Sequence, residues 1–405
     1  MKLTQLAFST LCLLTFPLLL AADERPDWIK DGPYTDDEVI ELTVPVEMFA
    51  NQVHVEVEVN GTPRRFLFDT GSPSMMNAAV AADLGLEAVD RRQSRDSHGA
   101  VVETEIVQAD LTVGGTTFRK VPVFVAEFPN VAQCLFDGVL GSELLPLCAW
   151  QIDVPAAVLR CSTDVSSLNH VAGARRLPLH DFGYPHAPFV DVQLARDARS
   201  KALFDTGSPE YLTISPPDLQ GAKRNGGVTS TMTGAGSIGG SIGGQAPEKE
   251  QVMVRLNELA LGDVSLGPVN AVLRESPPSL IGASILLHFV VTLDHKSSTA
   301  YLHQYRDGPF SRPSFGFGLA FDDPVSVSMV WDNSPAAKAG LQVGQAVTAL
   351  SGRPTDTSCA GIRSALQVMT ESDTLDIEWD GGTAALSRAI PIDSRTETEQ
   401  QYLPD

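Results

Sequence analysis

The chain has 405 residues, of which 43% are hydrophobic and 20% charged, a composition typical of globular proteins with two or three domains. Its formal net charge of −21, with no run of basic residues, argues against nucleic acid and anionic membranes as partners, since both select clusters of Lys and Arg.

The N-terminus has the pattern of a secretory signal peptide. Met1-Lys2 is followed by an apolar stretch from Leu6 to Leu20 and then by the small residues Ala21-Ala22. Ser, Thr and Pro interrupt this stretch, which is shorter than the roughly 20 residues of a comfortable membrane span. We therefore predict a cleaved signal peptide over 1–22, no stable membrane span after cleavage, and a protein that is periplasmic (in a Gram-negative bacterium) or secreted. An uncleaved membrane anchor is the alternative.

Four cysteines remain after cleavage, and an oxidising compartment permits disulfides between them. Cys148 and Cys161 flank an expected hairpin over 149–160, where facing positions can be bridged, so we predict that pair. Cys134 and Cys359 are expected to be free.

In chain order, residues 23–36 are acidic and rich in turn-forming residues, which predicts a solvated leader. Alternating apolar residues then predict strands, and Asn60-Gly61 predicts a tight hairpin. The second strand of that hairpin ends in the motif Phe68-Asp69-Thr70-Gly71-Ser72-Pro73. A short helix capped by Asn77, further strands and the apolar Val139-Leu140-Gly141 follow.

The second part of the chain repeats this plan. The motif returns as Phe204-Asp205-Thr206-Gly207-Ser208-Pro209, and Leu280-Ile281-Gly282 follows it at a similar spacing. Two matched anchors in the same order indicate an internal duplication. The polar segment of about 163–186 between the copies is expected to be a linker.

A third unit of a different kind follows Gly308-Pro309. It contains Phe315-Gly316-Phe317-Gly318-Leu319, a strand over 325–330, the segment Ser334-Pro335-Ala336-Ala337-Lys338-Ala339-Gly340-Leu341 and an expected helix over 360–369. The tail from Asp393 is polar.

The repeated Asp is the chemically important residue. A carboxylate at the end of an apolar strand is costly to place, and its duplication suggests that Asp69 and Asp205 meet. Two adjacent carboxyl groups share one proton, so that one accepts a proton from water while the other donates.

With this duplicated motif and its two apolar-apolar-Gly segments, residues 37–308 resemble the aspartic proteases in their single-chain, two-lobed form. The resemblance implies a mostly β fold: two pepsin/retropepsin-like lobes over 37–165 and 187–308. Asp69 and Asp205 would be the catalytic dyad, and the supporting residues would be Thr70, Gly71, Ser72, Thr206, Gly207, Ser208, Gly141 and Gly282. Both serines are expected to donate to the carboxylates, which favours an acidic working range.

Residues 312–393 resemble a PDZ domain (α+β) of bacterial exported proteases. The resemblance implies that the backbone of Phe315, Gly316, Phe317, Gly318 and Leu319 binds the carboxylate of a peptide or C-terminal tail, which adds as a strand. The alternative is a packing module with a closed groove.

Two segments are candidate flaps over the cleft, 96–100 and the Gly-rich 233–244. The second also matches a dinucleotide-binding and a serine-hydrolase pattern, but no apolar helix follows it, so we predict a loop. The histidines and cysteines lack metal-site spacing, and no metal or cofactor is expected.

The sequence therefore predicts an exported aspartic endopeptidase whose PDZ domain recruits or positions polypeptide substrates. The rival is a peptide-binding protein that keeps the protease fold without cutting, and a weaker option is a precursor whose segment 23–50 covers the cleft until it is removed.

Overall fold

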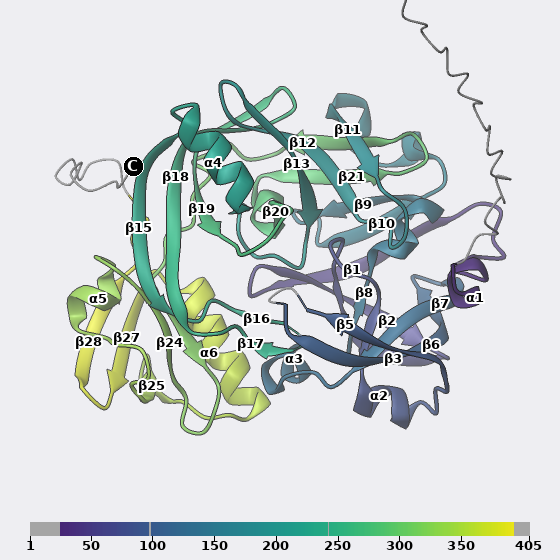
Figure 1. Ribbon diagram of the computed structural model, residues 1–405. Helices are drawn as coiled ribbons and strands as arrows, with labels where there is room; N and C mark the ends of the chain where they lie inside the picture. Colours follow the sequence, from purple (N-terminus) through teal and green to yellow (C-terminus); the bar gives the residue numbers. More distant parts are fainter. Residues whose placement is uncertain (1–24, 97–98, 242, 393–405) are drawn as a thin grey trace, which may run out of the picture.

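The computed structural model describes residues 25–96, 99–241 and 243–392 (Figure 1). The predicted signal peptide, the tail from Asp393 and parts of both candidate flaps (97–98 and 242) lie outside the described residues. The fold is mostly β, as predicted. We call residues 41–162 the first β unit, 175–304 the second β unit and 312–392 the C-terminal unit.

The first β unit is organised around two parallel strand pairs. Strand β3 (Thr62–Phe68) runs parallel to β8 (Gly138–Leu140), and β4 (Met75–Asn77) runs parallel to β7 (Thr116–Ala126). The turn between β3 and β4 carries the first Asp-Thr-Gly. The remaining elements are β2 (Gln52–Val59), α2 (Ala78–Asp83), β5 (Ala88–Arg95), β6 (Val101–Val113), α3 (Asn130–Leu135) and the 3-10 helix η1 (Ser142–Leu147). Asn77 caps α2 as predicted, because its side chain accepts the N–H of Ala79.

The second β unit repeats this arrangement. Strand β13 (Ala198–Asp205) runs parallel to β20 (Leu280–Gly282), and β14 (Leu212–Ile214) runs parallel to β19 (Val264–Leu273). A helix follows β14, just as α2 follows β4. The remaining elements are β12 (Pro188–Ala195), α4 (Pro216–Arg224), β15 (Val228–Gly236), β16 (Gly240–Ser241), β17 (Gly244–Gln245), β18 (Lys249–Leu261) and η4 (Ala283–Leu287). The predicted loop at 233–244 is therefore wrong at 233–236, which belong to β15, and at the short strands β16 and β17, which pair with each other.

A six-stranded antiparallel sheet joins the two units. Its order is β1–β10–β9–β21–β22–β11, with β9 and β21 paired at the centre. The strands are β1 (Glu41–Phe49), β9 (Ala149–Asp153), β10 (Val158–Ser162), β11 (Arg175–Asp181), β21 (Phe289–Asp294) and β22 (Thr299–Gln304). The linker prediction is wrong at β11, which lies inside the expected linker yet forms an edge of this sheet.

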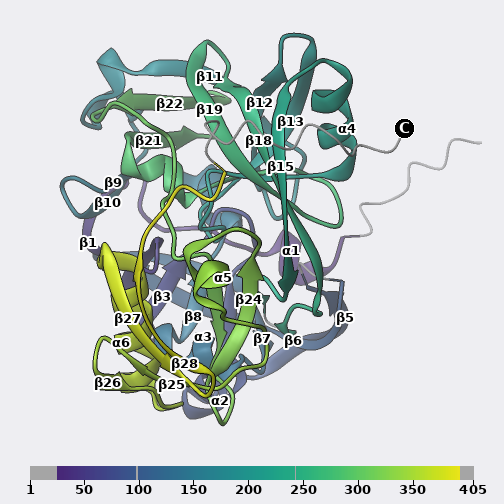
Figure 2. The same cartoon turned by 90° about the vertical axis from the view of Figure 1, so that its left-hand side faces the viewer.

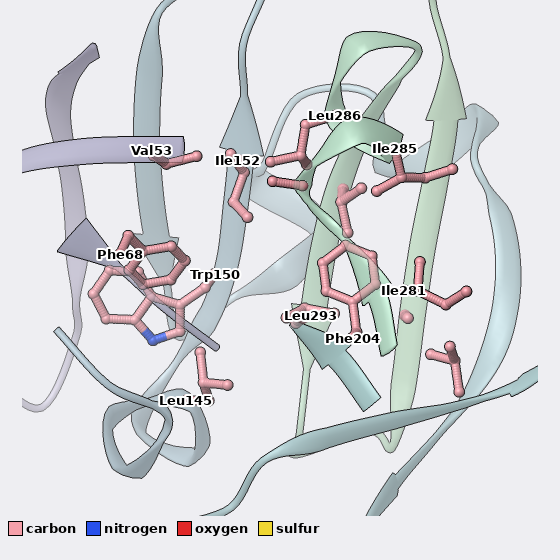
Figure 3. Close-up of a cluster of buried hydrophobic side chains, with 14 of the residues drawn as sticks. Val53, Phe68, Leu145, Trp150, Ile152, Phe204, Ile281, Ile285, Leu286 and Leu293 are labelled. Atoms are coloured by element: carbon pink, nitrogen blue, oxygen red, sulfur yellow. The ribbon is translucent and has the colours of Figure 1, made fainter. Parts of the chain in front are cut away.

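One hydrophobic core extends through both units. Its buried side chains include Phe68 and Trp150 on one side and Phe204, Ile281 and Leu293 on the other (Figure 3). The rings of Phe68 and Trp150 lie 5.5 Å apart. The residue before each Asp is thus anchored in one continuous core, which fixes the turns that carry the carboxylates.

The expected N-terminal leader is partly structured. Helix α1 (Asp27–Lys30) buries Trp28, whose ring meets Phe124 and Tyr184 edge to face and whose indole N–H donates to Asp90. The prediction of a solvated leader is therefore wrong at α1. Strand β1 forms part of the central sheet, which argues against a removable segment reaching residue 50.

The C-terminal unit has its own core around Phe315, Phe317, Val327, Ile362 and Ile377. Its elements are β23 (Phe317–Ala320), β24 (Ser326–Trp331), α5 (Pro335–Ala339), β25 (Val347–Leu350), β26 (Arg353–Pro354), α6 (Cys359–Glu371), β27 (Thr374–Trp379) and β28 (Gly382–Ser387). Strands β15 and β18 extend from the second β unit to β24 (Figures 1 and 2), and β15 pairs with it.

Two disulfides are present. The Cys148–Cys161 pair is confirmed and bridges the β9–β10 hairpin, with Cα atoms 5.7 Å apart. The expectation that Cys134 and Cys359 are free is wrong, because they form a disulfide between α3 and the start of α6. Among the described residues, no helix is long and apolar enough to cross a membrane.

Candidate active site

The two Asp-Thr-Gly turns face each other across the junction of the β units. A Cβ atom added to Gly71 would lie 2.4 Å from Cγ of Asp205, and one added to Gly207 would lie 2.4 Å from Oδ2 of Asp69. Each glycine therefore lets its backbone approach the carboxylate of the other turn, which no larger residue permits. The two carboxyl groups hydrogen-bond to each other.

Thr70 and Thr206 connect the turns reciprocally. The N–H of Thr70 donates to Oγ1 of Thr206 at 3.1 Å, and the N–H of Thr206 donates to Oγ1 of Thr70 at 3.2 Å. Each hydroxyl donates across the junction in turn, Thr70 to the carbonyl of Phe204 at 2.5 Å and Thr206 to that of Phe68 at 2.7 Å. Both side chains are fully buried, so these four bonds fix the spacing of the carboxylates.

We expect Thr70→Val to lower the free energy of unfolding by roughly 2–4 kcal/mol, because it removes a hydroxyl bond and leaves the buried N–H of Thr206 unpaired. Thr70→Ser is the matched control, since it retains the hydroxyl. Urea unfolding of the two variants checks this; equal stabilities would contradict it.

The surroundings of the two carboxylates differ. Asp69 accepts the N–H of Gly71 at 2.8 Å and the hydroxyl of Ser72 at 2.9 Å. Asp205 accepts backbone N–H groups from Gly207 at 2.9 Å and Ser208 at 3.2 Å. The expected serine donors are thus present, with Ser72 acting through its side chain and Ser208 through its backbone.

Asp205 is the carboxyl of the pair whose pKa is raised. Burial raises its pKa well above the usual range, and the negative charge of Asp69 and the hydrogen bond between the two carboxyls raise it further. The N–H groups of Ser208 and Gly207 oppose this only in part. An ionised carboxylate beside a protonated one can take a proton from water and give one to a substrate oxygen.

The predicted glycines of the apolar-apolar-Gly segments lie directly behind the turns. A Cβ on Gly141 would be 2.2 Å from the backbone nitrogen of Ser74, and one on Gly282 would be 2.3 Å from the carbonyl oxygen of Glu210. The next residue in each segment donates its N–H to the carbonyl of Ser72 or Ser208, at 2.9 and 2.7 Å.

Glu143 is a site residue that sequence reasoning missed. It is 1% exposed, and both of its carboxyl oxygens lie 3.0 Å from the N–H of Ser74, on the turn that carries Asp69. Burial raises its pKa to about 7. The duplication aligns Ser284 with it in the second β unit, where the hydroxyl donates to the carbonyl of Pro209. The signal that could have revealed Glu143 is an acid inside the apolar stretch 139–145.

A second missed contact links the β1–β2 hairpin to the turn after Asp205. Asn51 donates to the hydroxyl of Ser284 at 2.9 Å, and Gln52 donates to the carbonyl of Gly207 at 3.0 Å. The first β unit thus supports the catalytic turn of the second.

Both candidate flaps meet at their tips. The hydroxyl of Ser241, in the β15–β18 hairpin, donates to the carboxylate of Asp96 at the end of β5. A Cβ on Gly243 would lie 2.3 Å from that carboxylate and 3.2 Å from Ala100. The two hairpins, one from each β unit, are therefore in direct contact.

The residues predicted to bind a peptide carboxylate divide into two groups. Phe315 and Phe317 point into the core of the C-terminal unit and do not line a surface. Gly316 adopts φ +83°, and Gly318 and Leu319 are half-buried on β23, which among the described residues pairs only with β24. The backbone of 316–319 is therefore what this segment offers to an added strand.

Within the described part of the chain, no group of three or more His, Cys, Asp or Glu residues could hold a metal ion.

Comparison with known proteins gives one family match and similar solved structures. Residues 55–144, which include the first Asp-Thr-Gly, match the family described as aspartyl protease. No curated protein matches the chain. Among solved structures, the aspartic proteinase from Irpex lacteus is 14% identical, with a TM-score of 0.42 over 65% of this chain and 97% of that one. The family match supports an aspartic protease fold, and peptide hydrolysis as the activity that this fold suggests.

Proposed function

We propose that this chain is an exported aspartic endopeptidase, periplasmic or secreted, with Asp69 and Asp205 as its catalytic residues. The observation that carries the proposal is the pair of turns that places two hydrogen-bonded carboxyl groups together, each facing the glycine of the other turn. A protein that only binds peptides has no need for two half-buried acids held this close together.

In the proposed mechanism, ionised Asp69 takes a proton from a water molecule whose oxygen attacks the peptide carbonyl carbon. Asp205 gives its proton to the carbonyl oxygen, which yields a neutral gem-diol. One hydroxyl of the gem-diol then returns a proton to Asp205 while Asp69 protonates the amide nitrogen. The C–N bond breaks, and the pair again holds one proton.

Hydrolysis of an unfolded polypeptide tests this proposal. We expect cleavage that is fastest at acidic pH, because Asp69 must be ionised and Asp205 protonated, and we expect inhibition by a statine-containing peptide. The protein should be incubated with a denatured polypeptide from pH 3 to 8, and the fragments measured by mass spectrometry. Absence of cleavage at every pH would leave the rival, a protein that holds peptides without cutting them.

For the C-terminal unit we propose the role of a PDZ domain that captures polypeptide C-termini. The support is the edge of β23 that pairs with no second strand among the described residues, and the glycine-containing turn that precedes it. We expect substrates with a free C-terminal carboxylate to have a KM roughly tenfold lower than the same substrates with an amidated C-terminus, with similar kcat. Equal KM values for the two forms would contradict this role.

A further inference from the structure

The C-terminal unit is attached to both β units, at two separate places. On the second β unit, β15 pairs with β24 from Gly234 opposite Trp331 to Gly236 opposite Met329. Met232 and Met253 pack against Met329 and Trp331 at the same junction. This attachment combines backbone pairing with a buried apolar cluster, so it is extensive.

The attachment to the first β unit is different in kind. The Cys134–Cys359 disulfide joins α3 to the first residue of α6, and Cys134 lies within the core cluster of the C-terminal unit. Around it, Asn130 donates to the carbonyl of Thr357 at 3.1 Å. Arg363 lies 4.8 Å from the ring of Phe49 and 3.7 Å from the carboxylate of Glu47. The contacts of Asn130 and Glu47 are partly exposed, and exposed pairs of this type contribute little. Beside them, Cys134 and the partly buried Val131 are the residues of α3 that pack against the core of the C-terminal unit.

The two disulfides differ in exposure. Cys359 is exposed, whereas Cys148 and Cys161 are 6% and 1% exposed inside the β9–β10 hairpin. Exchange requires a thiolate to reach a disulfide sulfur, so accessible disulfides are the labile ones. A reductant can therefore reach the bond between the units and spare the bond within the hairpin.

The position of the exposed disulfide connects it to the cleft. The strand that pairs with the C-terminal unit, β15, belongs to the same hairpin whose tip meets Asp96. The first β unit is thus linked through the disulfide to the C-terminal unit, and that unit is linked through β24 to this hairpin, whose tip contacts the first β unit again.

We propose that Cys134–Cys359 is a redox modification site that fixes the C-terminal unit across both β units, and that its reduction by a dithiol loosens the β15–β18 hairpin. One thiolate of the dithiol attacks the sulfur of Cys359 and releases the thiolate of Cys134, which takes up a proton. The second thiol of the dithiol displaces Cys359 as its thiol, so two electrons pass to the protein and the dithiol becomes a disulfide. The effect on cleavage rests on the proposed protease function, whereas the reduction and the loosening do not.

The first test follows the thiols. The full-length protein is treated with a limiting amount of dithiothreitol, alkylated, digested and analysed by mass spectrometry. We expect alkylation of Cys134 and Cys359 to be faster than that of Cys148 and Cys161 by a factor on the order of ten. Simultaneous alkylation of all four, or earlier alkylation of the hairpin pair, would overturn the proposal.

The second test uses Cys134→Ser/Cys359→Ser, with Cys148→Ser/Cys161→Ser as the matched control. The measurement is hydrogen exchange of the backbone amides of β16 and β17. Exchange should be roughly tenfold faster in Cys134→Ser/Cys359→Ser than in untreated wild type, and equally fast in dithiol-treated wild type. The control variant should exchange at the rate of untreated wild type. Unchanged exchange in both Cys134→Ser/Cys359→Ser and dithiol-treated wild type would overturn the proposal, whether or not the protein cleaves peptides.

The third readout depends on activity. Cleavage of an unfolded polypeptide should rise at least roughly threefold in Cys134→Ser/Cys359→Ser, because a long chain needs a wider opening than a short peptide does. Cleavage of a short peptide should stay at the wild-type rate. If exchange is faster but the wild type cleaves nothing, the redox site is retained and the protease function is rejected. If exchange is faster but the cleavage rate of the polypeptide is unchanged, the effect of the hairpin on substrate entry is rejected.

Discussion

Asp69→Asn and Asp205→Asn should each lower kcat/KM for peptide cleavage by roughly 10³-fold or more, with the fold retained. An amide at position 69 cannot take a proton from water, and one at position 205 cannot deliver the carboxyl proton. The structure places both side chains in one hydrogen-bonded pair, so the two losses should be similar in size and the double variant should lose little more. Initial rates on a fluorogenic peptide measure this.

The control for these variants is Asp263→Asn, which changes an exposed carboxylate in a surface ion pair with Arg175. It should cleave at the wild-type rate. Circular dichroism and thermal unfolding should show that all the variants remain folded. Wild-type activity in either dyad variant would contradict the assignment of the catalytic residues.

The second large effect concerns Glu143, whose folded-state pKa is raised from 4.5 to about 7 by burial. Below pH 4.5 the carboxyl is protonated in both the folded and the unfolded chain, so its burial costs little. Between pH 4.5 and 7 the unfolded chain loses this proton first, and the free energy of unfolding falls. The total fall in the free energy of unfolding from Glu143 is about 3 kcal/mol, at 1.36 kcal/mol per unit of pKa difference between the folded and the unfolded chain.

Glu143→Gln should remove this loss, because the amide stays neutral at every pH. Urea unfolding at pH 4 and pH 8 should therefore show a smaller pH dependence in Glu143→Gln than in the wild type. The difference between the two proteins isolates Glu143 from Asp205, which shifts in the same direction. Glu58→Gln, on an exposed position of β2, should behave as wild type. If the free energy of unfolding of Glu143→Gln depended on pH as strongly as that of the wild type, the role assigned to buried Glu143 would be contradicted.

The candidate site was accessible from the sequence because the chain contains it twice. The repeated Asp-Thr-Gly-Ser-Pro and the glycines at 141 and 282 identify the residues that the structure brings together. The Cys148–Cys161 disulfide was predictable for a different reason, since it closes a single hairpin whose register follows from local sequence.

Features that depend on docking between distant segments were not predictable. Cys134 and Cys359 are 225 residues apart, and their pairing requires α3 to lie against α6. Strand β11 was not predicted because its buried Leu177 and Leu179 follow two arginines and are separated by a proline, a pattern typical of a linker. The pairing with β22 makes this segment a strand. Glu143 stands out in the sequence as an acid inside an apolar stretch, but its partner is the backbone N–H of Ser74, and no side-chain pattern identifies that contact.

Binding of a statine-containing peptide by calorimetry tests most directly whether the two carboxyls work as a proton-sharing pair. Statine imitates the tetrahedral gem-diol, so its hydroxyl is recognised by the pair and its flanking residues by the groove. At pH 4.5 the wild type should bind it at least about 100-fold more tightly than Asp69→Asn or Asp205→Asn, while all three bind a matching peptide without the hydroxyl equally well. Equal affinity of all three proteins for the statine peptide would mean that the chain holds peptides in a groove without using the two acids.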